Sequence, residues 1–221
     1  MPGYQVKHQT INIGGLDYAI RSLLDNQQYA DPLGAAVETG MGASGWPLFG
    51  QVWPSARVLA LAMHSHAIAG KRILEIGAGL ALASLVIHRR AGDVTVTDWH
   101  PLTEGFLHEN LLANGLGPLP YQAGNWAVDG ASGASSLGLF DLIIGSDVLY
   151  ERQQPAQLAR FIHQHTNTGA EIIIVDPDRG NRSAFCREMA ALGYDLTMTS
   201  AEKTLESGEA YKGRFLTFGH A

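Results

Sequence analysis

The sequence is poor in cysteine and in charge. Its 221 residues include one cysteine, Cys186, so the chain cannot form an internal disulfide. This is compatible with a reducing compartment, and we expect a cytoplasmic location. Charged residues make up only 16%, and Lys and Arg do not cluster. The basic surface that replaces counterions on a nucleic acid is therefore lacking, and we expect no nucleic-acid partner.

Long apolar stretches are also missing. The longest, residues 80–87, includes a serine and is far too short to span a bilayer. Residues 1–10 contain no apolar segment of the kind that a secretory signal requires. We therefore expect neither a membrane partner nor secretion through a signal peptide.

Motifs for metal binding and hydrolysis are absent as well. The chain has no paired cysteine ligands, and its closely spaced histidines, His64 with His66 and His163 with His165, lie two residues apart. Side chains at that spacing do not share a helix face, so we expect no metal site. The sequence also lacks the G-x-S-x-G turn of many hydrolases.

What the sequence does contain is 46% hydrophobic residues and 26 glycines. This hydrophobic share is typical of a globular protein with one substantial core, and it excludes disordered and fibrous classes. The formal net charge of −6 favours a cationic substrate or a cationic patch on another protein.

The first fifty residues differ from the rest. Residues 9–13 and 16–20 alternate in polarity on either side of two glycines, which predicts a β-hairpin. Residues 29–45 are rich in glycine and predict an irregular segment. We therefore assign residues 1–50 to an accessory hairpin with an irregular segment, and residues 51–221 to the main domain.

From Trp53 onward, short strands alternate with helices. This alternation predicts an α/β fold of the Rossmann-like type, a mostly parallel seven-strand sheet with helices on both faces. The expected strands are 72–76, 93–97, 119–123, 141–145, 171–175, 194–199 and 213–219, and the last two pair as a C-terminal antiparallel hairpin. The expected helices begin at residues 54, 80, 102, 155 and 183.

The most informative motif is the stretch 73–82, in which a strand leads into Gly77-Ala78-Gly79 and a helix. The next strand ends in Asp98, 23 residues after Glu75, a spacing that brings a carboxylate to ribose hydroxyls. A dinucleotide site favours a glycine where Leu82 stands, and Glu75 would repel a pyrophosphate. S-adenosylmethionine carries an ammonium and a sulfonium but no phosphate, and it suits the motif better. A strand–helix turn without a ligand is the remaining alternative.

These residues resemble class I, seven-β-strand S-adenosylmethionine-dependent methyltransferases. Within that class, the chain is similar to the protein lysine methyltransferase group, also labelled nicotinamide N-methyltransferase-like. The resemblance spans about residues 51–178 and rests on five segments: 52–56, 74–79, 97–98, 125–126 and 141–150. The glycine motif alone is typical of the whole class. The pattern Asp147-x-x-Tyr150 after the fourth strand, together with Trp53 and Trp126, restricts the resemblance to the protein lysine methyltransferase group.

The resemblance implies a role for ten residues. The cofactor would be bound by Trp53, Glu75, Gly77, Gly79, Asp98, Asn125, Trp126 and Ser146. Glu75 and the glycines would hold its methionine end, Asp98 its ribose, and Asn125 with Trp126 its adenine. Asp147 and Tyr150 would face the methyl acceptor. The chain departs from the common pattern at Ala81, where many members have a third glycine, and at Asn125, where aspartate is frequent.

The implied reaction is methyl transfer from S-adenosylmethionine to a nitrogen, above all to a lysine side chain of a protein substrate. A small-molecule N-methyltransferase and an inactive, cofactor-binding interaction protein are the alternatives.

From the residues alone, plainer roles stay open. Asp147 would cap a turn or the next helix, Tyr150 would be a half-buried core side chain, and the tryptophans would pack in the core. Asp98 is expected at an exposed strand end, where its removal leaves no cavity. The turn at residues 176–179 would shape the substrate mouth or simply reverse the chain.

Overall fold

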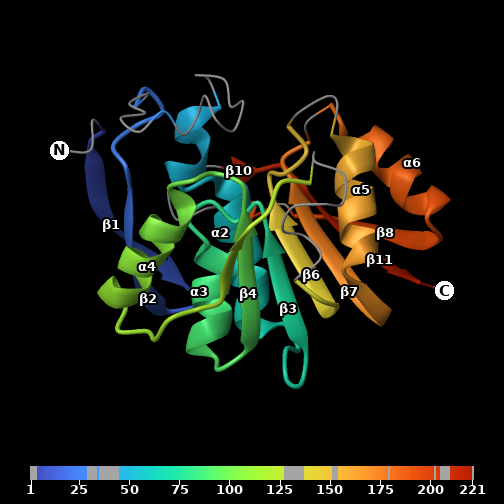
Figure 1. The fold of residues 1–221 in the computed structure, drawn as a ribbon, viewed down its shortest axis with the longest axis horizontal. Coiled ribbons are helices and arrows are strands. Elements are labelled where there is room, and N and C mark those ends of the chain that lie inside the picture. Colours follow the sequence, from blue (N-terminus) through green and yellow to red (C-terminus); the bar gives the residue numbers. More distant parts are fainter. Residues whose placement is uncertain are drawn as a thin grey trace.

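The computed structural model describes residues 4–28, 34, 45–126, 137–150, 154–178, 180–201, 203–204 and 210–220. Its seven-stranded sheet has the order β5-β4-β3-β6-β7-β11-β8 (Figure 1). The strands are β3 (Arg72–Ile76), β4 (Asp93–Asp98), β5 (Tyr121–Ala123), β6 (Phe140–Ser146), β7 (Thr166–Asp176), β8 (Tyr194–Ser200) and β11 (Arg214–His220). Strands β3 to β7 run parallel, and β11 lies antiparallel between β7 and β8. The predicted sheet and its antiparallel C-terminal pair are confirmed.

Helices cover both faces of this sheet. One face carries α2 (Pro54–Ser65), α3 (Leu82–Arg89) and α4 (Thr103–Ala113), and the other carries α5 (Pro155–Gln164) and α6 (Arg182–Ala191). Alternate strand residues point to opposite faces, so Ile73 joins the core under α2 and α3 while Leu74 joins the core under α5 and α6. A strand that is buried on both faces favours apolar residues throughout, and β6 and β7 accordingly contain continuous apolar runs at residues 142–144 and 172–175.

Several element boundaries differ from the sequence prediction by one or more residues, and two of these differences have a clear structural cause. Strand β7 begins at Thr166 rather than at residue 171, because an irregularity in the register lets Thr166 pair with Phe140. Helix α3 begins at Leu82 rather than at residue 80, because Gly79 and Ala81 have left-handed φ values of +53° and +55°. Apart from residues 34 and 45, the irregular segment predicted at 29–45 lies outside the described residues.

The N-terminal hairpin is confirmed as β1 (Val6–Ile13) and β2 (Leu16–Leu23), each longer than predicted. It packs against α4 at one end of the molecule (Figure 1). Asn110 of α4 and Asn114, the C-cap residue of the same helix, bind the outer edge of β2. The Asn114 side chain accepts from the amide of Ala19 at 2.9 Å and donates to its carbonyl at 2.7 Å. Asn110 does the same for Arg21 at 2.7 and 3.3 Å.

The hairpin therefore shares the core of the sheet. Ile11 and Ile20, each 1% exposed, belong to the cluster under α2, α3 and α4. A short helix, η1 (Trp46–Gly50), follows, and Phe49 joins the same cluster. A division at residue 50 does not separate two cores.

Two further short strands, β9 (Lys203–Thr204) and β10 (Ala210–Tyr211), pair with each other. None of the helices in the described part of the chain is long and apolar enough to cross a membrane.

Candidate functional site

A cavity of about 650 Å³ opens at the carboxyl ends of β3, β4 and β6. Here β3 has β4 on one side and β6 on the other, and this reversal of strand order is where open α/β sheets bind ligands. Eight of the ten predicted site residues line the cavity: Trp53, Gly77, Gly79, Asp98, Trp126, Ser146, Asp147 and Tyr150. Glu75 and Asn125 do not.

The glycine turn after β3 forms the floor of the cavity. Gly77 and Gly79 have φ values of +55° and +53°, which favour glycine over any residue with a Cβ atom. A Cβ atom on Gly79 would lie 2.8 Å from the carbonyl oxygen of Phe49, and one on Gly77 would lie 2.8 Å from Cγ1 of Val148. The turn therefore presents bare backbone to the cavity.

Glu75 lies beneath this turn rather than on the cavity wall. Its side chain is buried, and its Oε2 atom accepts hydrogen bonds from the Ser84 amide, at 2.8 Å, and from the Ser84 hydroxyl. Burial raises the pKa of the Glu75 carboxyl to about 7, although the bonds from Ser84 oppose this shift. The structure thus ties Glu75 to the first turn of α3, and its predicted contact with a cofactor stays a prediction.

This buried carboxyl predicts a pH-dependent stability. The folded pKa of about 7 exceeds the unfolded value of 4.5, so the folded chain keeps a proton that the unfolded chain releases. The stabilising contribution is complete below pH 4.5 and is lost as the pH rises through about 7. Glutamine cannot ionise. As the pH rises from about 5 to about 8, the free energy of unfolding of Glu75→Gln should therefore increase relative to wild type by on the order of 2 kcal/mol. Urea unfolding of both proteins across this range checks the result, and parallel pH profiles would contradict it.

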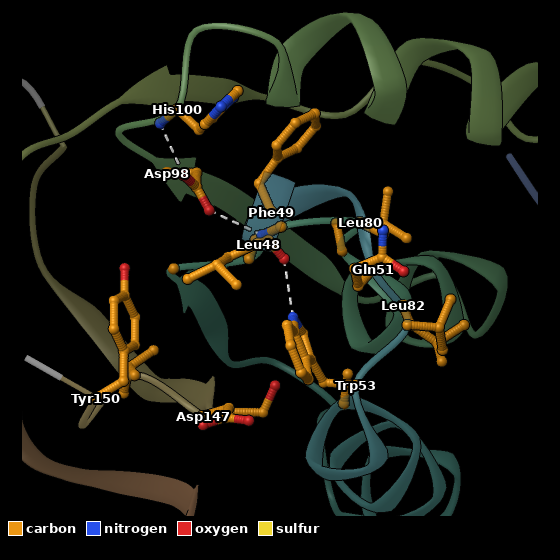
Figure 2. A pocket seen from close by; sticks show the side chains of 18 of the residues that line it. Leu48, Phe49, Gln51, Trp53, Leu80, Leu82, Asp98, His100, Asp147 and Tyr150 are labelled. Carbon is orange, nitrogen blue, oxygen red and sulfur yellow. Dashed lines mark hydrogen bonds between the residues drawn. The ribbon is translucent and has the colours of Figure 1, made fainter. Parts of the chain in front are cut away.

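Asp98 corrects one sequence expectation, because it is buried rather than exposed. Only 5% of the residue is accessible. Its Oδ2 atom accepts from the Gly79 amide and its Oδ1 atom from the His100 amide, both at 2.8 Å (Figure 2). Burial raises the pKa of this carboxyl, and the backbone donors oppose the shift. Asp98 still lines the cavity, but it also holds the glycine turn to the end of β4.

Removal of the Asp98 side chain should therefore damage the fold as well as the site. Asp98→Ala leaves the amides of Gly79 and His100 without their acceptor, and we expect a loss of about 2 kcal/mol in the free energy of unfolding. Asp98→Asn keeps an acceptor oxygen for one of the two amides and should lose less than Asp98→Ala. Chemical denaturation of both variants checks this. Equal stabilities for Asp98→Ala and wild type would restore the exposed-strand-end interpretation.

The two tryptophans of the site are held by hydrogen bonds. Trp53 directly precedes α2, and its Nε1 atom donates to the Leu48 carbonyl at 2.8 Å (Figure 2). Trp126 is 8% exposed, and its Nε1 atom donates to Oε1 of Gln154 at 3.1 Å. Trp126 belongs to the core under α5 and α6, Trp53 is half-buried, and both residues line the cavity. Asn125 is half-buried beside Trp126.

The end of β6 brings Ser146, Asp147 and Tyr150 to the cavity wall. Asp147 has a φ of +57°, and its amide donates to the Val175 carbonyl at 2.9 Å. It does not cap the next helix, because α5 has Gln154 at its N-cap. Tyr150 is 37% exposed and is not a core side chain. In Figure 2, Asp147, Tyr150 and Trp53 lie on one side of the cavity and Asp98 on the other.

Sequence reasoning missed the wall that η1 supplies. Leu48 and Phe49 line the cavity, as do His100 and, from the hairpin, Ile20. The Phe49 ring stacks on His100, with ring centroids 3.8 Å apart and an interplanar angle of 17°. Pro47 in the first turn of η1 was the available signal, because proline is favoured at helix starts.

The charge of the site is negative. Two carboxylates, Asp98 and Asp147, line the cavity, and none of the described lining residues is Lys or Arg. A cation is therefore the ligand that this wall favours. Within the described ranges, no three His, Cys, Asp or Glu side chains are grouped so that they would hold a metal ion.

Comparisons with known proteins agree with this geometry. A family model described as lysine methyltransferase matches residues 41–190. Calmodulin-lysine N-methyltransferase of Arabidopsis thaliana is 27% identical over 174 residues, which cover 71% of this chain and 57% of the relative. Protein N-lysine methyltransferase METTL21A of Danio rerio is 30% identical over 130 residues, 56% of this chain and 58% of the relative. A methyltransferase from Pyrococcus furiosus has a similar fold, with a TM-score of 0.60 at 18% identity, covering 76% of this chain and 87% of that one.

Proposed function

The chain belongs to the lysine methyltransferase family, and on this premise we propose that it transfers a methyl group from S-adenosylmethionine to a lysine amine of a protein substrate. The observation that carries the proposal is the position of Asp147 and Tyr150 on an anionic cavity that also contains the glycine turn and Asp98. The chain spans just under three fifths of the length of the two relatives named above.

The cavity residues fit S-adenosylmethionine. The turn at Gly77 and Gly79 has room for no side chain, so its backbone is free to approach a ligand. Asp98 stands at the end of the neighbouring strand, where a ribose would place its hydroxyls. The absence of Lys and Arg from the described lining suits a sulfonium and an ammonium and opposes a pyrophosphate. Trp53, Trp126 and Ser146 would complete the cofactor wall.

When bound, S-adenosylmethionine supplies an electrophilic methyl group on a sulfonium leaving group. The protein contributes position and local field rather than acid–base chemistry. The Asp147 carboxylate accepts a hydrogen bond from the incoming amine and aligns its lone pair with the methyl carbon. Tyr150 presents an aromatic face to the cation. A lysine ammonium would lose one proton to water, and its neutral nitrogen would then bond to the methyl carbon as the bond from that carbon to sulfur breaks. The products would be a neutral thioether and a methylated ammonium, so no side chain of the protein has to take up or release a proton.

Exposure at the mouth favours a macromolecular acceptor. Tyr150 is 37% exposed, so the acceptor side of the cavity reaches the surface. A lysine side chain carried on a protein can enter such an opening, whereas a small molecule gains most from enclosure on all sides. We further propose that the protein acts in the cytoplasm, where Cys186 stays reduced, and that the acidic chain avoids nucleic acids. In this view residues 51–221 form the methyltransferase domain, with residues 1–50 as its accessory segment.

Cofactor binding is the first test. At a hundredfold excess over Kd, S-adenosylmethionine should stabilise the fold by about 2.7 kcal/mol. For a chain of this length the Tm should rise by roughly 5–10 °C. Scanning calorimetry with S-adenosylmethionine, S-adenosylhomocysteine and NAD checks this. A shift with NAD alone would reject the proposal. Incubation with methyl-labelled cofactor and a heat-treated cell lysate then identifies the acceptor protein.

A further inference from the structure

The loop Asp147–Tyr150, here called the acceptor loop, has a backbone that needs support. Asp147 is not glycine, yet its φ of +57° lies in the left-handed region. Such a conformation costs about 1–3 kcal/mol and persists only where the surroundings impose it. The groups that impose it therefore determine where the Asp147 carboxylate and the Tyr150 ring are held.

The junction between β7 and α6 holds this loop at two points. At its start, the Asp147 amide donates to the carbonyl of Val175, the penultimate residue of β7. Further along, the Leu149 carbonyl accepts from Nδ2 of Asn181 at 2.9 Å. Leu149 itself is 3% exposed, so its carbonyl lies in a part-buried region where a lost donor is costly.

Asn181 uses its side chain in an unusual way for its position. It is the N-cap residue of α6, where an asparagine oxygen ordinarily accepts from an amide of the first helical turn. No such capping bond is made, and the side-chain amide reaches 32 residues back to the acceptor loop instead. The residue therefore joins two elements rather than stabilising its own helix.

The junction itself is well anchored. Asp176 is fully buried at the end of β7, and its Oδ2 atom accepts from the Asp178 amide at 3.1 Å. Arg182 of α6 bonds the Asp178 carboxylate and lies 3.8 Å from Oδ2 of Asp176. Asp176 and Asp178, which belong to the turn that the sequence singled out at residues 176–179, thus give Asn181 a fixed reference point, although neither side chain lines the cavity. Residue 179 lies outside the described residues.

We propose that Asn181 is a positioning residue for the methyl acceptor. It acts through Leu149 to hold Asp147 and Tyr150 in a fixed position relative to the glycine turn, and it touches neither substrate nor cofactor. This inference rests on the proposed function, since it concerns the acceptor side of the same cavity.

The test is Asn181→Asp, which keeps the shape of the side chain but replaces the amide donor by a carboxylate. Aspartate is as good an N-cap as asparagine, so α6 should survive. Asn167→Asp is the matched control, because Asn167 also donates from Nδ2, to Asp141 at 2.9 Å, but on the exposed start of β7. Three quantities are measured for each protein: labelling rate of the strongest lysate acceptor at saturating S-adenosylmethionine, cofactor Kd, and hydrogen exchange of residues 147–150.

For Asn181→Asp we expect about a tenfold lower labelling rate, a cofactor Kd within about twofold of wild type, and exchange of the acceptor loop at least about tenfold faster. Asn167→Asp should match wild type in all three. The inference would be overturned if Asn181→Asp had the same labelling rate and the same exchange rates as wild type. It would also be overturned if the cofactor Kd rose by as large a factor as the labelling rate fell. If wild type neither binds cofactor nor labels a protein, the proposed function fails, while the exchange rates still decide whether Asn181 holds the loop.

Discussion

Replacement of Asp147 by asparagine should lower kcat about a hundredfold while the Kd of S-adenosylmethionine changes by less than about threefold. The asparagine keeps the size of the side chain but removes its charge. A lysine amine arrives mostly protonated, because its ordinary pKa is about 10.4, and it is attracted to the negatively charged wall of the cavity. After it loses its proton, the amine must be held in line with the methyl group. Both effects belong to the acceptor and not to the cofactor, so the loss should appear in turnover.

The control for this result is Asp195→Asn, which removes the same charge from an exposed position on β8. It should leave turnover and cofactor binding unchanged. The measurement is the initial rate at saturating cofactor and acceptor, with Kd from calorimetry. Equal turnover in Asp147→Asn and wild type would mean that Asp147 serves only the backbone turn in which it lies.

Substitution of Gly79 by alanine should be the most damaging single change in the cofactor half of the site. The new Cβ atom would lie 2.8 Å from the Phe49 carbonyl oxygen, and a backbone atom has no rotamer by which to move away. The φ of +53° adds about 1–2 kcal/mol for a residue with a Cβ atom. We expect a loss of about 3 kcal/mol in the free energy of unfolding and about a hundredfold weaker cofactor binding, because the turn and η1 must separate.

Gly105→Ala provides the comparison. Gly105 lies within α4, and a Cβ atom added there would have nothing within 4 Å, so alanine should be neutral or stabilising by up to about 1 kcal/mol. Thermal unfolding and calorimetric titration of both variants check the pair. If Gly79→Ala bound the cofactor as tightly as Gly105→Ala, the glycine turn would not be the cofactor floor.

The sheet was predictable because its signals are local. Strands β3, β6 and β7 contain short apolar runs, and β4 alternates valine with threonine, so each has a pattern that can be recognised without knowledge of its neighbours. The extension of β7 to Thr166 was not predictable, because it depends on pairing with Phe140 on another strand. The start of α3 likewise depends on the left-handed φ of Ala81, and an alanine in the sequence gives no indication of such a backbone conformation.

The site was predictable where residue type and strand end coincide. Asp98 is the last residue of β4 and Asp147 directly follows β6, so both lie at the carboxyl edge of the parallel sheet and reach one cavity. The burial of Asp98 was missed, because it results from two amides, those of Gly79 and His100, that only the folded turn supplies. Glu75 was expected beside the glycine turn and lies there, but its bond with the Ser84 amide depends on how α3 begins. The part of the cavity wall that η1 supplies was missed because so short a helix shows no hydrophobic periodicity in the sequence.

From the two asparagines at the end of α4 we expect a consequence for the order in which the chain folds. Four residues of helix rise about 6 Å and two residues of strand about 6.8 Å, so Asn110 and Asn114 match alternate residues of β2 as a neighbouring strand would. An isolated two-stranded hairpin is marginally stable in water. The N-terminal hairpin, although it precedes α4 in the chain, should therefore become ordered only when α4 is in place, and its native docking should be among the last steps of folding.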